Sequence, residues 1–198
     1  MRYQWRRQRR SGWTLLLLFA LIGAMALARY GRLDPSVTAD APLAGEEGLE
    51  EPEQKLIALT FDDGPRRSTT TELLDGLAQR GVKATFFLIG AQVEANRDVV
   101  RRMDREGHQI GIHTYDHVKL TDLNRTDFDA QVEKTRAELV AALDHNDFLL
   151  RPPYGMLDDS VKAWAGCPII LWSIDPEDWN DQNADRVVQE VVSQARDG

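Results

Sequence analysis

The chain has 198 residues, 42% of them hydrophobic, and its 32 acidic and 24 basic side chains give a net charge of −8. This length suits one folded domain and is short for two. The acidic balance argues against nucleic acid as a partner, because phosphate binding needs a basic surface. The single cysteine, Cys167, excludes an internal disulfide.

The first 30 residues have the pattern of an export signal. Five arginines among residues 1–10 precede an uncharged apolar stretch over residues 12–28. Such an order holds the N-terminus in the cytoplasm and sends the following chain outward. We expect residues 1–30 to form a cytoplasmic basic stub with a signal anchor or a signal peptide, both of which remain open, and the domain to lie outside the cytoplasm. A buried helix of a soluble fold is a weaker alternative, since it leaves the arginine cluster without a purpose.

Residues 31–54 show no apolar period and combine three prolines with a run of acids, which predicts a disordered acidic linker. From residue 55 to residue 198 the pattern alternates between strands and helices. We expect strands at 55–61, 83–90, 108–113, 148–151 and 168–174, and helices at 68–81, 91–107, 125–145, 160–166 and 184–196. This alternation predicts an α/β fold with a mainly parallel sheet, open or closed into a barrel. Leu56, Ile57 and Trp172 are expected to be buried.

Two adjacent acids, Asp62 and Asp63, follow the first expected strand. Neighbouring carboxylates repel each other, and burying either is costly unless a positive charge compensates. Farther along, "HTYDH" places His113 and His117 four residues apart, so both imidazoles can face one point. Two histidines and one carboxylate, with a fourth coordination position left open for water, are typical of a catalytic zinc site. The second aspartate could then act as the base that accepts a proton from this water. For the histidines alone, chance spacing in a surface loop is the alternative.

Two later segments add polar and aromatic side chains at strand ends. Arg151, in "LLRPPYG", could pair with a carboxylate and hold it ionised, or could be an ordinary surface arginine. The prolines at 152 and 153 form a rigid turn that suits a backbone amide directed at a substrate. In "SIDPEDW", Trp179 beside acids could form one wall of a sugar-sized cleft.

Four motifs, "TFDDGP", "HTYDH", "RPPYG" and "DPEDW", stand in the order of the NodB-type polysaccharide deacetylases, carbohydrate esterase family 4. The chain resembles that family from about Leu56 to its end. The resemblance implies a distorted (β/α) barrel and metal-dependent removal of N-acetyl groups from glycans. It also implies zinc as the cofactor, for which other divalent transition metals such as Co²⁺ could substitute.

The resemblance implies a role for each matching residue. Asp63, His113 and His117 would be the metal ligands, and Asp62 the general base. Arg151 would orient Asp62, and the backbone N–H of Tyr154 would stabilise the oxyanion. Pro153 and Trp179 would contact the substrate, and Asp178 would hold a catalytic histidine.

One family motif is not found: a leucine and a histidine, two residues apart, on a strand after the final helix. Of the four histidines, His108 is expected to be structural and His145 to lie at a helix end. The sequence as printed therefore has no evident acid to protonate a leaving amine and no closing strand. We expect a longer reading frame, with a naturally short chain as the alternative.

The sequence thus predicts a metal-dependent enzyme that removes N-acetyl groups from an envelope glycan, foremost the N-acetylglucosamine of peptidoglycan. Chitin-type glycans come next. Two alternatives stay open. One is an O-acetyl polysaccharide esterase. The other is a catalytically inactive glycan-binding module, although the intact Asp62 argues against it, since a pure binding protein needs no base. We expect a monomer whose partners are the glycan and, through its N-terminal segment, the membrane.

Overall fold

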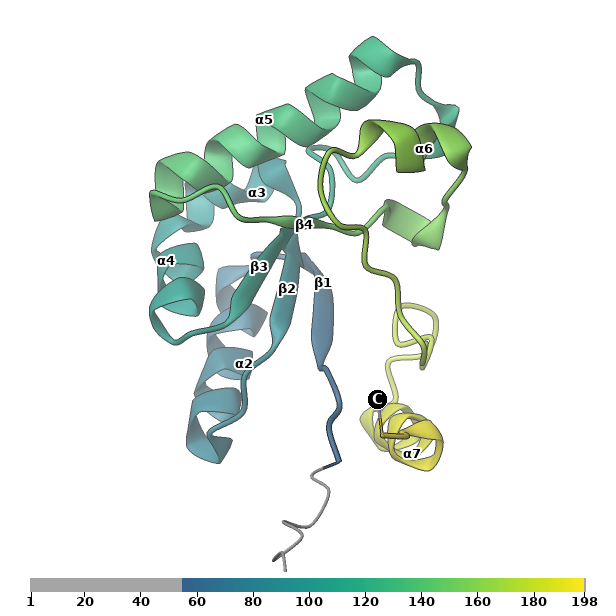
Figure 1. Ribbon diagram of the computed structural model, residues 1–198. Coiled ribbons are helices and arrows are strands. Elements are labelled where there is room, and N and C mark those ends of the chain that lie inside the picture. Colours follow the sequence, from purple (N-terminus) through teal and green to yellow (C-terminus); the bar gives the residue numbers. More distant parts are fainter. Residues whose placement is uncertain (1–54, 198) are drawn as a thin grey trace, which may run out of the picture. The chain divides into compact units, whose positions relative to one another are not determined.

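The computed structural model describes residues 55–197 (Figure 1). The expected export segment, residues 1–30, and the expected linker, residues 31–54, lie outside the described residues. Within the described part, no helix has both the length and the apolar character to cross a membrane.

The described chain alternates strands with helices in the predicted order. The strands are β1 (Thr60–Gly64), β2 (Thr85–Leu88), β3 (Gln109–Ile112) and β4 (Leu149–Leu150). The α-helices are α2 (Arg67–Arg80), α3 (Gly90–Val93), α4 (Arg97–Arg105), α5 (Arg125–Leu143), α6 (Asp159–Trp164) and α7 (Ala184–Gln194). Short 3₁₀ turns are η1 (Glu94–Asn96), η2 (Leu120–Asp122) and η3 (Pro153–Gly155).

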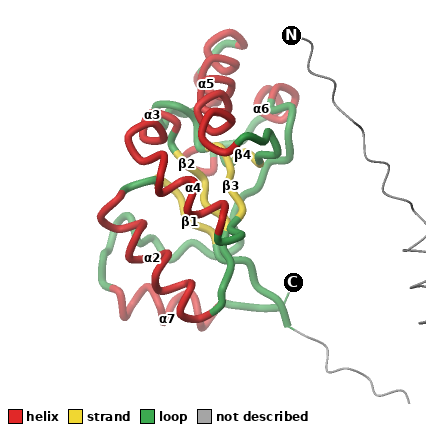
Figure 2. The backbone as a smooth tube through the Cα atoms, turned by 90° about the vertical axis from the view of Figure 1, so that its left-hand side faces the viewer, coloured by secondary structure: helices red, strands yellow, loops and turns green. Residues whose placement is uncertain are grey.

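The strands form a four-stranded sheet in the order β1-β2-β3-β4, and every pair is parallel. The prediction of an α/β fold with a parallel sheet is therefore confirmed. Helices α2 and α4 lie side by side on one face of this sheet, and α4 also packs against α5 (Figures 1 and 2). Among residues 55–197 the sheet is open, because β1 has a single strand partner and only an isolated bridge, Leu150 to Ile169, extends it beyond β4.

The core lies between the sheet and its helices. Helix α5 places Phe128, Val132 and Leu139 in this core at helical spacing, as predicted. The helix begins where the side chain of Asn124 accepts a hydrogen bond from the N–H of Asp127. The other large side chains in the core come from β2, β3, β4 and the helices, and include Leu74, Phe87, Leu88, Val100, Met103, Ile112 and Leu150.

Two predicted strands differ from the observed ones. The first begins at Thr60, and Leu56 and Ile57 are 64% and 61% exposed. The reason is that pairing with β2 starts only at Leu59, whose carbonyl accepts the N–H of Thr85. Residues 168–174 form no strand and make a single bridge, because their neighbour β4 is only two residues long. Trp172 in that segment is 38% exposed, so its predicted place in the core is wrong.

The predicted helix 91–107 is also divided. It consists of the short helix α3, the 3₁₀ turn η1 and helix α4. The start of α3 faces the loop after β3, since the N–H groups of Gly90 and Ala91 donate to the carbonyls of Thr114 and Tyr115. The first turn of the divided segment is therefore bound to the loop between His113 and His117.

Candidate active site

The predicted site residues lie at the carboxyl ends of three parallel strands of the sheet, β1, β3 and β4. Asp62 and Asp63 lie at the end of β1, His113 directly follows β3, and Arg151 directly follows β4. The carboxyl ends of parallel strands meet at one edge of a sheet, which is where ligands bind in open α/β folds. The strand order therefore brings side chains together that are up to 89 residues apart in sequence.

Asp63, His113 and His117 form a possible metal site. The Nε2 atoms of His113 and His117 lie 3.5 and 3.2 Å from Oδ1 of Asp63, and one ligand atom from each residue lies within 4.8 Å of the others. Zinc bonds of about 2.0–2.1 Å at tetrahedral angles would place neighbouring ligand atoms about 3.3 Å apart. Two imidazole nitrogens and one carboxylate oxygen are also a donor set that zinc accepts. The residues present therefore fit a divalent transition metal.

His113 is prepared for metal binding by its second nitrogen. Its Nδ1 lies 2.7 Å from the carbonyl oxygen of Arg151, and because a carbonyl only accepts, Nδ1 carries the proton. Nε2 therefore keeps its lone pair and faces Asp63. Burial also lowers the pKa of His113, which favours the neutral form that a metal requires.

Asp62 is held by Arg151 and takes no part in the three-residue cluster. Nη1 of the buried Arg151 donates to Oδ1 of Asp62 and to the hydroxyl of Thr60, each at 2.8 Å. The same guanidinium donates to the carbonyls of Ile170 and Leu171. Five N–H donors on a planar group suit such a set of fixed acceptors. The other carboxylate oxygen of Asp62, Oδ2, lies 4.0 Å from Nε2 of His113 and thus faces the cluster.

Unusual backbone geometry accompanies these side chains. Six non-glycine residues among residues 55–197 have a positive φ, and five of them, Asp63, Thr114, His117, Tyr154 and Glu177, belong to the four sequence motifs. Positive φ is uncommon for non-glycine residues, and such conformations gather at functional sites. Tyr154 lies in η3, and its exposed ring packs at 4.8 Å from the ring of His117.

The remaining site predictions rest on fewer contacts. Pro153 is buried in η3 beside Tyr154. Trp179 is 73% exposed in the loop before α7. Among residues 55–197, Asp178 makes no side-chain hydrogen bond or ion pair, and no contact joins it or Trp179 to the metal cluster. Both substrate-binding residues and Asp178 stay predictions.

Two polar residues that contact the site were missed in the sequence. Thr60 lies two residues before Asp62, on the same side of β1, and this period-two spacing was a usable signal. Gln131, in the middle of α5, accepts from backbone N–H groups of the "HTYDH" loop. Nothing in the local sequence marks it, because its partners lie 16 and 15 residues away in the chain and the contact depends on how α5 packs.

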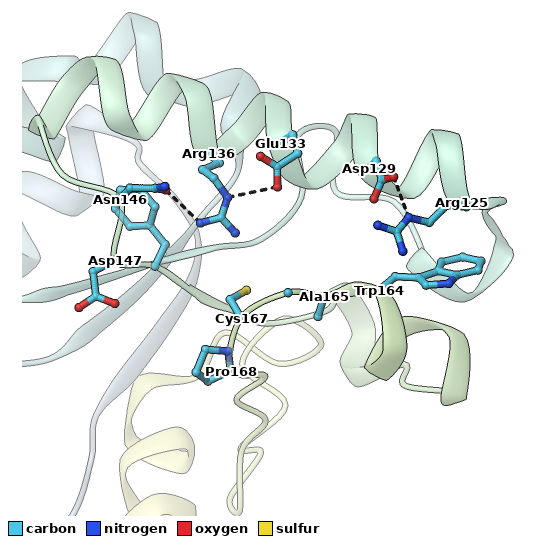
Figure 3. Close-up of a pocket in the computed structure, with 12 residues that line it drawn as sticks. Arg125, Asp129, Glu133, Arg136, Asn146, Asp147, Trp164, Ala165, Cys167 and Pro168 are labelled. Carbon is cyan, nitrogen blue, oxygen red and sulfur yellow. Dashed lines mark hydrogen bonds and ion pairs between the residues drawn. The ribbon is translucent and has the colours of Figure 1, made fainter.

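A separate hollow of about 720 Å³ lies between α5 and the segment that follows α6 (Figure 3). Four of its charged side chains form two ion pairs within α5, Arg125 with Asp129 and Arg136 with Glu133. Trp164 on its wall packs edge-on against Phe128. None of its lining residues belongs to the metal cluster, so this hollow is separate from the candidate active site.

A carboxylate beside a two-histidine, one-carboxylate cluster on a parallel sheet is typical of metal-assisted hydrolases. The family model described as polysaccharide deacetylase matches residues 50–166. The chain belongs to the polysaccharide deacetylase (NodB, carbohydrate esterase 4) family, whose members are hydrolases.

Similar proteins include a peptidoglycan-N-acetylmuramic acid deacetylase, PdaC of Bacillus subtilis, which is 38% identical over 153 residues, or 77% of this chain and 33% of the relative. The peptidoglycan-N-acetylglucosamine deacetylase PgdA of Listeria monocytogenes is 43% identical over 144 residues, or 73% of this chain and 31% of the relative. The solved structure of the Bacillus subtilis PdaC matches with a TM-score of 0.72 and 38% identity, covering 74% of this chain and 73% of that one. The chain spans about a third of the length of these two curated relatives.

Proposed function

We propose that this chain removes N-acetyl groups from an envelope glycan, with N-acetylglucosamine of peptidoglycan as its first substrate. The observation that carries the proposal is the cluster of Asp63, His113 and His117 beside an Asp62 that Arg151 holds in place. Family membership supports an N-acetylated polysaccharide as the substrate class. The two relatives are named for different peptidoglycan sugars, so the choice of N-acetylglucosamine is the finer part of the proposal.

The residues of the site divide the work of amide hydrolysis. Asp63, His113 and His117 would hold a divalent ion, zinc or a substitute such as Co²⁺, which when bound polarises a carbonyl and lowers the pKa of water. Asp62 accepts the proton of the attacking water through Oδ2, while Arg151 keeps Oδ1 in place. The backbone N–H of Tyr154 donates to the oxyanion that develops on the acetyl carbonyl. The C–N bond then breaks as the nitrogen takes up a proton, from the protonated Asp62 or from solvent, and acetate and the free amino sugar leave.

Hydrolysis of O-acetyl esters on a polysaccharide is the second candidate. The observation that favours it is the placement of the four histidines. His113 and His117 belong to the metal cluster, Nδ1 of His108 accepts from the N–H of Ala84, and His145 lies beside Asp104. No histidine among the described residues is left to protonate a leaving amine, and an ester depends less on such an acid.

Acetate release tests the proposal. The zinc-loaded protein should release acetate from N-acetylglucosamine oligomers and from peptidoglycan, and Asp62→Asn should lose this activity while still binding the glycan. Glycan binding without acetate release from either amides or esters would contradict the proposal and would fit a glycan-binding module.

We also propose that the four strands are part of a distorted (β/α) barrel. The support is the similarity to the PdaC structure and the free edge of β1, next to which Leu56 and Ile57 are exposed. An experimental structure of the protein with that edge of β1 unpaired would contradict the barrel.

For the location, we propose that residues 1–30 export the domain and anchor or release it outside the cytoplasm. The arginine-rich start followed by an apolar stretch supports this. Fusing residues 1–54 to a reporter that is active only outside the cytoplasm tests it, and a silent reporter with full expression would contradict it.

A further inference from the structure

The loop that carries His117 has a backbone conformation that needs outside support. Thr114 and His117 both have positive φ, at 61° and 56°, although neither is glycine. Such conformations persist only where the surroundings hold them. The position of Nε2 of His117, 3.2 Å from Asp63, therefore depends on what surrounds residues 114–117.

One side chain of α5 supplies that support from outside the loop. Oε1 of Gln131 accepts the N–H of Tyr115 at 3.0 Å and the N–H of Asp116 at 2.9 Å. Nε2 of Gln131 donates to Oδ2 of Asp116 at 2.8 Å. Both ends of this one amide therefore bind the two residues that separate Thr114 from His117.

Two carbonyl groups of the same loop are held by α3. The carbonyls of Thr114 and Tyr115 accept the N–H groups of Gly90 and Ala91 at 2.9 and 3.0 Å. Gly90 also packs closely against α5, since a Cβ on it would lie 2.6 Å from Oγ1 of Thr135. The helix that carries Gln131 is thereby fixed relative to the loop, and its amide has a defined place to bind.

We infer that Gln131 is a positioning residue of the metal site, which sets the orientation of His117 without touching the metal. The inference rests on the part of the proposed function in which Asp63, His113 and His117 bind a metal. Groups that orient metal ligands typically contribute about 10–100-fold to metal affinity. Because Asp116 is exposed and the N–H of Tyr115 is only partly buried, water can replace the lost hydrogen bonds, and the fold itself should survive the change.

Gln131→Leu tests the inference by metal affinity and by a spectrum. Zinc affinity is measured by competition with a chromophoric chelator, and the geometry of the site by the visible absorption of the Co²⁺-loaded protein. We expect zinc to bind about 10–100-fold more weakly and the Co²⁺ bands to change in position or intensity. Gln79→Leu, an exposed glutamine on α2, is the matched control and should leave both readouts unchanged.

Moving a carboxylate from residue 116 to residue 131 distinguishes a positioning role of the hydrogen bonds from simple packing. Gln131→Glu keeps the acceptor but places a carboxylate against that of Asp116, so zinc affinity should fall. Adding Asp116→Asn restores a donor facing an acceptor, and affinity should return to within about threefold of the original protein, as expected for two directly coupled residues. This pair of variants also decides the question if Gln131→Leu does not fold.

Three results are distinguishable. Zinc affinity within twofold of the original protein and an unchanged Co²⁺ spectrum in folded Gln131→Leu would overturn the inference, as would a failure of Asp116→Asn to rescue Gln131→Glu. An original protein that binds no zinc at all would instead contradict the proposed metal site, and the inference would fall with it.

Discussion

Asp63, His113 and His117 supply three ligand atoms around one point, and three ligands leave no redundancy. We therefore predict that alanine at any one of these positions abolishes stoichiometric zinc binding. Elemental analysis of the purified variants measures this, with His145→Ala as a control that should keep its zinc. Full zinc occupancy in Asp63→Ala would show that the ion is held elsewhere.

Asp62 has a different role from its neighbour, and one substitution separates the two. Asp62→Asn preserves the shape of the side chain but removes the base, so zinc should stay bound while turnover falls by roughly 10²–10⁴-fold. Acetate release and metal content are measured on the same preparation. If the asparagine variant lost its metal, the roles of the two aspartates would have to be exchanged.

The residues that could be predicted from sequence are those whose chemistry is local. Asp62 and Asp63 are adjacent, and His113 and His117 lie four residues apart, so each pair carries a readable pattern. Gln131 could not be found in this way. It reaches the loop at Tyr115 from 16 residues away, and only the packing of α5 brings it there.

At the scale of elements, the missing side chain of Gly111 in β3 leaves room for the ring of Phe87 in β2. A Cβ at Gly111 would lie 2.5 Å from the ring of Phe87 and 3.1 Å from the carbonyl of Leu149. The guanidinium of Arg151 lies 4.1 Å from the centre of that same ring. Gly111→Ala should therefore displace the Phe87 ring that Arg151 covers and destabilise the domain by about 1–3 kcal/mol, as overpacking of a core does.

Urea unfolding measures this change, and a second glycine gives the control. Gly76 lies inside α2, and a Cβ on it meets nothing closer than a flexible arginine end at 3.6 Å. Gly76→Ala should stabilise the domain by about 0.5–1 kcal/mol, because alanine is the better helix former. Equal effects of the two substitutions would refute the close approach at Gly111.

Helices and strands differed in how well they could be predicted. Helix α5 was readable because its buried residues recur at helical spacing within one segment. The segment 168–174 has a strand-like composition but forms one bridge, since a strand also needs a partner with free hydrogen-bonding groups. Its neighbour β4 offers only Leu149 and Leu150. The sequence of residues 168–174 contains no pattern that indicates how long the neighbouring strand β4 is.

At the scale of the whole domain, a buried histidine should link stability to pH. Nδ1 of His108 accepts the N–H of Ala84 at 3.1 Å, which ties the starts of β2 and β3. Burial, together with nearby Lys83, lowers the pKa of His108 in the folded state. The unfolded chain therefore binds the proton more readily, so stability is fully present above a pH of about 6.5 and falls as the pH drops toward the folded-state pKa.

His108→Asn keeps an acceptor near the position of Nδ1 and removes the titration. Urea unfolding of the metal-free proteins at pH 7.5 and 5.5 should show a smaller loss of stability in this variant than in the original protein. Both proteins are compared without metal, so that His113 is free to titrate in each. Burial also lowers the pKa of His113, and its contribution then has the same direction in both proteins and cancels in the comparison. An equal loss in the two would mean that His108 is not a source of the pH dependence.

The last step of the proposed reaction depends on the whole set of titratable groups in the domain. Together with a bound divalent ion, Asp62, Arg151 and the N–H of Tyr154 would allow the tetrahedral intermediate to form, but expulsion of an unprotonated amine is very unfavourable. With no histidine assigned to this proton, amide rates should fall steeply as the basicity of the leaving amine rises, since a general acid normally contributes about 10²–10⁴-fold. The leaving group of an acetate ester is an alkoxide, which is a weaker base than an amide anion. The rates of ester hydrolysis should therefore depend far less on the leaving group. Comparing a series of N-acetyl arylamines with a series of acetate esters on the zinc-loaded 198-residue chain measures both slopes, and Asp62→Asn should abolish both reactions. A shallow slope for the amides would show that another group in the domain delivers the proton.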